Sequence, residues 1–212
     1  MEALGEQNDE IALAAFIDIV RQYREEPRYV LAATFHAWGC ALRLGKYQQA
    51  EQYFEAVRRD YPLATLLASI PQETIATLIA DYLNRADGLA DREPARSVRL
   101  FSTAAELAHH VSAAEQVRAG VFGASDVLLA EGKTDEAVRR LQELIADRHL
   151  PKHGRMLATL RLAHAWRLRG RIDNALEAYI AVIATADDRD DLRQWAQLWL
   201  GDLQLQIAGG DE

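Results

Sequence analysis

Histidines are the residues of this sequence best suited to bind a metal ion, because imidazole pairs at helical spacing can share one ion. His109 and His110 are adjacent, so on a helix their side chains point about 100° apart and cannot easily share an ion. His149 and His153 flank Pro151, which interrupts a helix, and basic neighbours there oppose a cation. We therefore expect no metal site.

Cys40 is the only cysteine, so the chain has neither an internal disulfide nor a four-cysteine metal site. It follows Trp38 in an apolar segment, which is more typical of a core residue than of a nucleophile. The sequence contains no glycine-rich phosphate loop, no His-Glu-x-x-His helix and no Gly-x-Ser-x-Gly elbow. We therefore expect no catalytic residue, no cofactor and no enzymatic activity.

The composition indicates which elements must position the functional residues. The 212 residues are 50% hydrophobic and 26% charged, with only 5 prolines and 12 glycines. Alanine, leucine, arginine, glutamate and glutamine are abundant, and these residues favour helices. We predict an all-α fold. No apolar run approaches the roughly 18 to 20 residues that span a bilayer, and no secretory signal is visible, so we expect a cytoplasmic protein without membrane insertion.

Charge is distributed unevenly along the chain. The net charge is -8, yet residues 133–171 contain ten lysines or arginines against four acidic residues. Such a segment is either a solvated basic face or a groove for an acidic partner segment.

Three segments align on a turn glycine, at Gly45, Gly132 and Gly170. Glycine accepts the left-handed conformation that ends a helix, and a small residue soon afterwards lets two helices approach closely. In each segment an alanine lies five residues after the glycine, and large side chains follow four and seven residues later. Each segment is therefore predicted to be a helical hairpin, with these inward positions: Ala50, Phe54, Val57; Ala137, Leu141, Leu144; Ala175, Tyr179, Val182.

The first segment resembles the tetratricopeptide repeat, whose pattern is a helix, a Gly-x-Tyr-x-x-Ala turn, a second helix with an aromatic residue, and a closing proline. Gly45, Tyr47, Ala50, Phe54 and Pro62 occupy the corresponding positions. The resemblance implies a right-handed superhelix of antiparallel hairpins, a solenoid in which each repeat contacts its neighbours.

On this resemblance, we expect a single domain over residues 1–212 with about four repeats and a half-repeat at each end. The second repeat is diverged, and its turn is predicted over residues 87–94, with Gly88 in the place of the turn glycine. The predicted parts are a half-repeat helix at 9–25, repeats at 30–61, 72–109, 111–148 and 153–186, and a terminal helix at 192–207.

The first helices of such repeats line a concave groove, and the resemblance carries this role to particular positions. Gly39, Asp126 and His164 stand where members that grip a C-terminal carboxylate have asparagines, so we do not expect such a clamp. An apolar groove with a basic flank instead fits an amphipathic helix or an extended segment with acidic residues, unless the apolar positions are core. The predicted groove residues are Phe35, Leu42, Phe122, Asp126, Leu129, Leu157, Leu160, His164 and Arg167.

The terminal helix at 192–207 is apolar over most of its circumference, although a terminal solenoid helix usually turns a polar face outward. We expect Trp195, Trp199 and Leu203 to form an interface with a partner or a second copy. The alternative is irregular packing that hides the whole apolar surface.

The favoured function is a protein-binding adaptor, scaffold or assembly chaperone. A self-assembling scaffold that uses the terminal half-repeats is the first alternative. Nucleic-acid binding through residues 139–171 is a weaker one, because the chain is acidic overall and no aromatic pattern accompanies those arginines.

Overall fold

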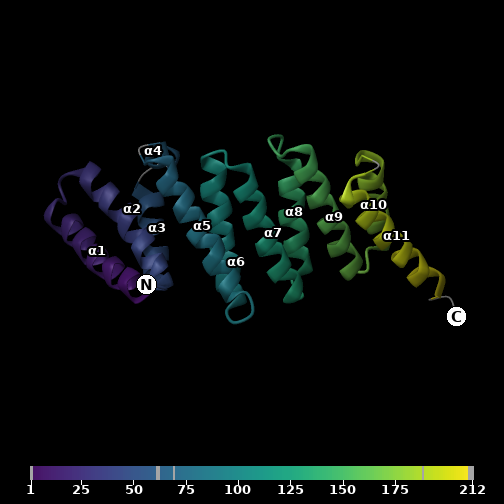
Figure 1. Cartoon of the computed structure of the whole chain (residues 1–212), viewed down its shortest axis with the longest axis horizontal. Helices are drawn as coiled ribbons and strands as arrows, with labels where there is room; N and C mark the ends of the chain where they lie inside the picture. Colours follow the sequence, from purple (N-terminus) through teal and green to yellow (C-terminus); the bar gives the residue numbers. More distant parts are fainter. Residues whose placement is uncertain (1, 61–62, 69, 188, 210–212) are drawn as a thin grey trace. The chain divides into compact units, whose positions relative to one another are not determined.

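The computed structural model describes residues 2–60, 63–68, 70–187 and 189–209, and every regular element in these ranges is an α-helix (Figure 1). The all-α prediction is confirmed. Pro62, which the repeat pattern uses, lies outside the described residues. In chain order the helices are α1 (Glu2–Gln22), α2 (Pro27–Arg43), α3 (Tyr47–Asp60), α4 (Leu63–Ala68), α5 (Gln72–Leu89), α6 (Pro94–His110), α7 (Ala114–Ala130), α8 (Thr134–Ala146), α9 (Lys152–Leu168), α10 (Ile172–Thr185) and α11 (Asp191–Gly209).

The chain divides into two compact units, and each is described by itself. The N-terminal unit comprises residues 1–84 and 110–112, and the C-terminal unit comprises residues 85–109 and 113–212. Consecutive helices pack on one another within each unit: α1 on α2 and α2 on α3 in the first, and each neighbouring pair from α7 to α11 in the second. This confirms a solenoid of helical hairpins, and its organisation as a single domain stays a prediction.

The predicted turn glycines end their helices in the same way. Gly45 has a φ of +68°, and the Lys46 N–H donates to the Ala41 carbonyl at 2.9 Å while the Gly45 N–H donates to Leu42 at 3.0 Å. This pair of bonds satisfies carbonyls that would otherwise be orphaned at the helix end. Gly132 and Gly170 have φ values of +71° and +72° and repeat both bonds.

The turn predicted over residues 87–94 is present but shorter, at residues 90–93, and Gly88 does not form it. Gly88 lies inside α5, which continues to Leu89, and α6 begins only at Pro94. A glycine within a helix costs about 1 kcal/mol, which packing of the rest of the helix can offset. The left-handed turn that the sequence did not indicate is at Ser112, whose φ is 56° and whose successor Ala113 donates to Ala108 at 2.8 Å.

The inward positions of the three hairpins are confirmed as core. The three alanines, which follow the turn glycines by five residues, are at most 1% exposed, so the paired helices approach closely at these points. The larger residues four and seven positions later are all buried as well. Burying each large side chain contributes about 1.5 to 3 kcal/mol of apolar transfer free energy.

Aromatic side chains fill the core of the N-terminal unit. Trp38 on α2 is fully buried, packs 4.9 Å from the Phe54 ring and edge-on to Phe35 at 5.5 Å, and donates its Nε1 proton to the Tyr82 hydroxyl on α5. Burial raises the pKa of the Tyr82 phenol well above its usual value, although the bond from Trp38 opposes this shift. Tyr82 therefore stays a neutral acceptor that satisfies the buried indole.

Helices α6 and α7 approach through glycines of the C-terminal unit. A Cβ placed on Gly120 would lie 2.6 Å from the Phe101 carbonyl oxygen and 2.9 Å from the Ala105 Cβ, and one on Gly123 would lie 2.4 Å from the Phe101 ring. A side chain at Gly120 would displace the α6 backbone, and one at Gly123 would displace the Phe101 ring.

Two arginines bind the carbonyl groups that end the preceding hairpin. Arg155, in the first turn of α9, donates to the carbonyls of Ile145, Asp147 and Leu150. Arg193, in the first turn of α11, donates to Ile183 at 3.0 Å. Since helix C-termini carry partial negative charge, each guanidinium satisfies and neutralises the end of one helix from the start of the next.

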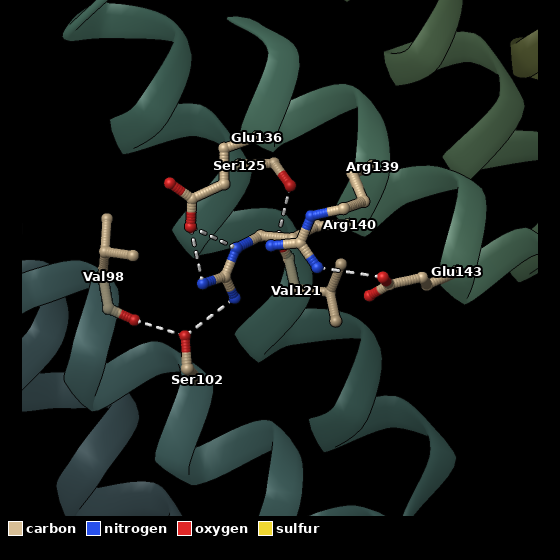
Figure 2. A network of polar contacts seen from close by, with 8 residues as sticks. All are labelled: Val98, Ser102, Val121, Ser125, Glu136, Arg139, Arg140 and Glu143. Carbon is tan, nitrogen blue, oxygen red and sulfur yellow. Dashed lines mark hydrogen bonds and ion pairs between the residues drawn. The ribbon is translucent and has the colours of Figure 1, made fainter. Parts of the chain in front are cut away.

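Helix α8 is tied to α6 by a polar network (Figure 2). Arg140 donates to the Ser102 hydroxyl at 2.8 Å and to the Glu136 carboxylate at 3.0 and 3.2 Å. Ser102 in turn donates to the Val98 carbonyl at 2.6 Å. The network links two helices that are separated by α7 in the sequence.

The two terminal helices extend beyond the predicted ranges. Helix α1 begins at Glu2 rather than at residue 9, and it packs along α2. Helix α11 spans Asp191–Gly209 and packs on α10 and α9.

Candidate partner-binding face on α7, α9 and α11

Helices α7, α9 and α11 of the C-terminal unit present a line of partly exposed charged and aromatic side chains. Arg161 on α9 pairs with Asp126 on α7 at 3.3 Å, and Arg167 on α9 pairs with Asp202 on α11 at 2.7 Å. His164 lies between the two arginines on the same helix. We call the following set the polar face: Asp126, Arg161, His164, Arg167, Trp199 and Asp202.

Aromatic rings support the charged groups of the polar face. The Arg161 Cζ atom lies 4.5 Å from the centroid of the Phe122 ring, a distance that suits a cation–π contact. The His164 ring lies 5.9 Å from Trp199, which in turn lies 6.0 Å from Trp195. The Arg161 and His164 side chains are therefore each in contact with an aromatic ring.

Electrostatics keep the polar face close to neutral. Partial burial raises the pKa of the Asp126 carboxyl, while the charge of Arg161 opposes the shift. Burial lowers the pKa of His164, and the positive charge of Arg167 lowers it further, so the imidazole is uncharged at neutral pH. Two arginines then face two aspartates, an arrangement that can exchange partners with charges on a bound polypeptide.

Two buried polar atoms near this face have no hydrogen-bond partner among the described residues. The Tyr179 hydroxyl on α10 is buried, and its ring packs 6.2 Å from Trp199. Burial raises the pKa of this phenol. The Arg161 Nε atom is likewise buried without a partner in the described part of the chain. Unsatisfied buried groups are uncommon in folded proteins.

The structure places only some of the predicted groove residues on this face. Asp126, His164 and Arg167 belong to it, and Leu129 and Leu157 are half-buried beside it. Phe122 and Leu160 are 7% and 3% exposed, because both sides of these apolar residues are covered by neighbouring helices. The last two are core residues, and the prediction that they line an open groove is wrong.

The two predicted groove residues of the N-terminal unit are also buried. Leu42 is fully enclosed, and Phe35, 2% exposed, packs against Trp38. Leu42 therefore cannot line an open groove. Phe35 does line a cavity between α1, α2 and α5.

The apolar surplus of the terminal helix is partly exposed, as the sequence indicates. Trp195 and Leu198 on α11 are 51% and 60% exposed, and Leu205 is 74% exposed. Leu203 is fully buried against the preceding hairpin, so its predicted place in a terminal interface is wrong. Trp199 is half-buried and belongs to the polar face.

Arg161 and Asp202 are members of the polar face that the sequence reasoning missed. Arg161 precedes the predicted residue His164 by three positions, and Asp202 follows the predicted residue Trp199 by three. Residues three and four apart share one side of a helix. Helical spacing from the predicted residues would have found both.

The described residues offer no site that suits catalysis by a metal. No group of three or more histidine, cysteine, aspartate or glutamate side chains in the described ranges is arranged to hold an ion. Within those same ranges no helix has the length and apolarity needed to cross a membrane. The polar face instead has the mixture of charge, aromatic surface and partial exposure found at binding sites for polypeptides.

Comparison with known proteins agrees with the hairpin geometry. Residues 39–64, from the C-terminal part of α2 through α3 to the start of α4, match the family model described as tetratricopeptide repeat. This is the segment whose residues carry the resemblance in the sequence, so that resemblance is confirmed. A search of curated proteins gave no match to the chain.

Proposed function

We propose that this chain, which carries a tetratricopeptide repeat at residues 39–64, is a non-catalytic module that holds a partner polypeptide on the polar face. Tetratricopeptide repeats generally mediate protein–protein interaction. The role is that of an adaptor, scaffold or assembly chaperone, in which binding itself is the function.

The observation that carries the proposal is the set of two Arg–Asp pairs beside Trp199. In the pairs the Arg161 and Arg167 side chains are 35% and 23% exposed, and their aspartates are about half exposed. Exposed pairs contribute only about 0 to 1 kcal/mol to folding, so their rearrangement on binding costs little. A partner segment that bears acidic and apolar side chains can pair with the arginines and cover the indole.

Affinity capture from a native cell lysate, followed by mass spectrometry, tests this proposal with two matched double variants. Asp126→Lys with Asp202→Lys reverses both acidic groups of the polar face. Asp135→Lys with Glu143→Lys makes the same charge change on α8, where each acid also pairs with an arginine. All four carboxylates are more than half exposed, so both variants are expected to remain helical.

We expect the polar-face variant to retain more of one polypeptide than the wild type and the α8 variant do, because its substitutions free Arg161 and Arg167 and add positive charge for an acidic partner. Circular dichroism checks that the helix content of the three proteins is equal. Equal recovery of every partner by both variants would contradict the assignment of binding to the polar face.

Self-assembly is a second candidate, favoured by the exposed apolar residues of α11. Trp195, Leu198, Leu205 and Ile207 are each 44% or more exposed. A cluster of large exposed apolar side chains on one helix is uncommon on a monomeric protein and often marks an interface.

Sedimentation velocity at a series of protein concentrations tests self-assembly. An oligomer that forms in the wild type and is lost in Leu198→Glu with Leu205→Glu would support an interface on α11. A monomer at all concentrations would exclude self-association as the function. A mutant that lost helix content would be replaced by Leu205→Gln alone, since Leu205 is the most exposed of these side chains.

Nucleic-acid binding is disfavoured, because most basic groups of 139–171 already bind carboxylates or carbonyls of the chain. Arg139, Arg140 and Arg169 pair with carboxylates on α8. Arg155 binds backbone carbonyls, and Arg161 and Arg167 pair with aspartates on the polar face. Phosphate groups would have to displace these contacts.

A further inference from the structure

A cavity of about 470 Å³ opens in the N-terminal unit between α1, α2 and α5. Its volume lies in the range of pockets that hold a small molecule or a partner side chain with adjoining backbone. The lining residues are Asp9, Ala12 and Phe16 of α1, Phe35, His36, Gly39, Cys40 and Arg43 of α2, and Glu73, Thr74, Thr77 and Leu78 of α5.

One side of the cavity is aromatic. The Phe16 ring of α1 stacks on the His36 ring of α2, with centroids 5.1 Å apart and planes inclined by 20°. Gly39 lies one turn further along α2 and has no side chain to fill the space beside them. A flat or aliphatic group can therefore lie against this wall.

The positive charge in the lining is already balanced. Arg43 donates to both oxygens of Asp9, at 2.6 and 2.9 Å, and its Nη1 lies 3.6 Å from Asp81. The His36 imidazole has a lowered pKa because of burial, and secondarily because of the Arg43 charge, so it is neutral at pH 7. Neither group attracts an anion strongly, because one is paired with two carboxylates and the other is uncharged.

The cavity lining also contains a negative charge that no cation of the lining balances. Glu73, on the α5 side, is exposed, and it forms no ion pair with any other residue of the described ranges. Its backbone carbonyl accepts a bond from the Thr77 hydroxyl at 2.8 Å, and both residues line the cavity. A cation entering the cavity would thus meet a carboxylate that has no competing partner.

We infer that this cavity binds an arginine side chain of a partner polypeptide, with the guanidinium paired to Glu73 and its plane and aliphatic stem against Phe16, His36 and Leu78. Arginine fits better than lysine because its planar group can form two bonds to one carboxylate and stack on a ring at the same time. The inference goes beyond the proposed function, because the cavity belongs to the N-terminal unit and does not depend on the polar face.

Nuclear magnetic resonance of the ¹⁵N-labelled full chain tests the inference with three small probes. They are N-acetyl-arginine methylamide, the corresponding lysine compound, and the uncharged norleucine compound. We expect saturable shifts of the Gly39, Thr74 and Thr77 amides with the arginine probe, weaker shifts with lysine and none with norleucine.

Two matched variants separate the charge of the cavity from the charge of the whole chain. Glu73→Gln should lower the affinity for the arginine probe by about fivefold, which is the effect of losing one partly exposed charge pair. Glu55→Gln removes an exposed glutamate of α3 outside the cavity and should leave the affinity unchanged.

Four results would overturn the inference: no saturable shift with the arginine probe, equal shifts with norleucine, equal affinity for lysine, or an unchanged affinity in Glu73→Gln. Because no partner protein enters this experiment, its outcome is independent of the test of the polar face.

Discussion

The guanidinium of Arg43 on α2 donates two hydrogen bonds to the Asp9 carboxylate on α1, at 2.9 and 2.6 Å. The two residues are 34 positions apart, so the pair fastens the first helix to the hairpin that follows it. It is the charged contact that defines one side of the cavity in the N-terminal unit.

Asp9→Asn should lower the free energy of unfolding by about 1 kcal/mol at pH 7, because it removes the charge from a partly buried, doubly hydrogen-bonded pair. Urea unfolding followed by circular dichroism measures the change. Asp18→Asn on the same helix is the control. Its ion pair with Arg21 is long and exposed, at 3.7 Å, so the expected change is within about 0.5 kcal/mol. Equal effects of the two substitutions would contradict a special role for Asp9.

The contribution of Asp9 should also depend on pH. The hydrogen bonds from Arg43 are the main cause of a pKa below the ordinary value of 3.8. A carboxyl whose pKa is lowered by folding stabilises the protein at pH values above the pKa that it has in the unfolded chain. This stabilisation is lost as the pH falls through the pKa of the folded state. The stability difference between wild type and Asp9→Asn should therefore be constant above about pH 5 and shrink below about pH 4. A difference that grew on acidification would contradict this account.

Gly120→Ala should destabilise the C-terminal unit by about 2 kcal/mol, because the new methyl group would overlap the Phe101 carbonyl and the Ala105 side chain. Thermal unfolding of the variant measures this loss. Gly201→Ala serves as the reference, since nothing lies within 4 Å of the added atom on α11. Alanine favours helices over glycine by up to about 1 kcal/mol, so this second change should stabilise. Two variants of equal stability would show that α6 and α7 do not meet at Gly120.

Arg155→Met should cost about 1 to 3 kcal/mol, because three backbone carbonyls between Ile145 and Leu150 lose their donor. Arg139→Met removes an exposed arginine that pairs only along its own helix, with Glu143, and should cost within about 0.5 kcal/mol. Hydrogen exchange should show faster opening of the C-terminal turn of α8 in Arg155→Met alone. Unchanged protection there would contradict the capping role.

The hairpins were predictable from the sequence because their signals are local. A left-handed residue at Gly45, an alanine five residues later and an aromatic residue at Phe54 fall within one turn and one helix. The turn at Ser112 was not predictable, because serine adopts positive φ only when tertiary contacts enforce it. Gly88 does not end its helix, although glycine often does, because packing stabilises the helix around it.

The candidate site was predictable only in part, because the sequence does not show whether an apolar residue on a helix is covered by a neighbouring helix or faces an open groove. Phe122 and Leu160 fit the groove positions of the repeat, yet neighbouring helices enclose them. Asp126, His164 and Arg167 were found because polar residues at the same positions resist burial. Arg155 and Arg193 both lie in the first turn of a helix, but their bonds to the carbonyls before that helix depend on the loop conformations, which the sequence does not show.

The most direct test of the proposed function is photo-cross-linking in cells, with a benzophenone amino acid placed singly at residue 126, 164 or 143. Residues 126 and 164 lie on the polar face, and residue 143 is an exposed position of α8. We predict a cross-link to the same partner polypeptide from 126 and 164, and none from 143. Cross-links from 143 alone, or from none of the three positions, would contradict binding on the polar face.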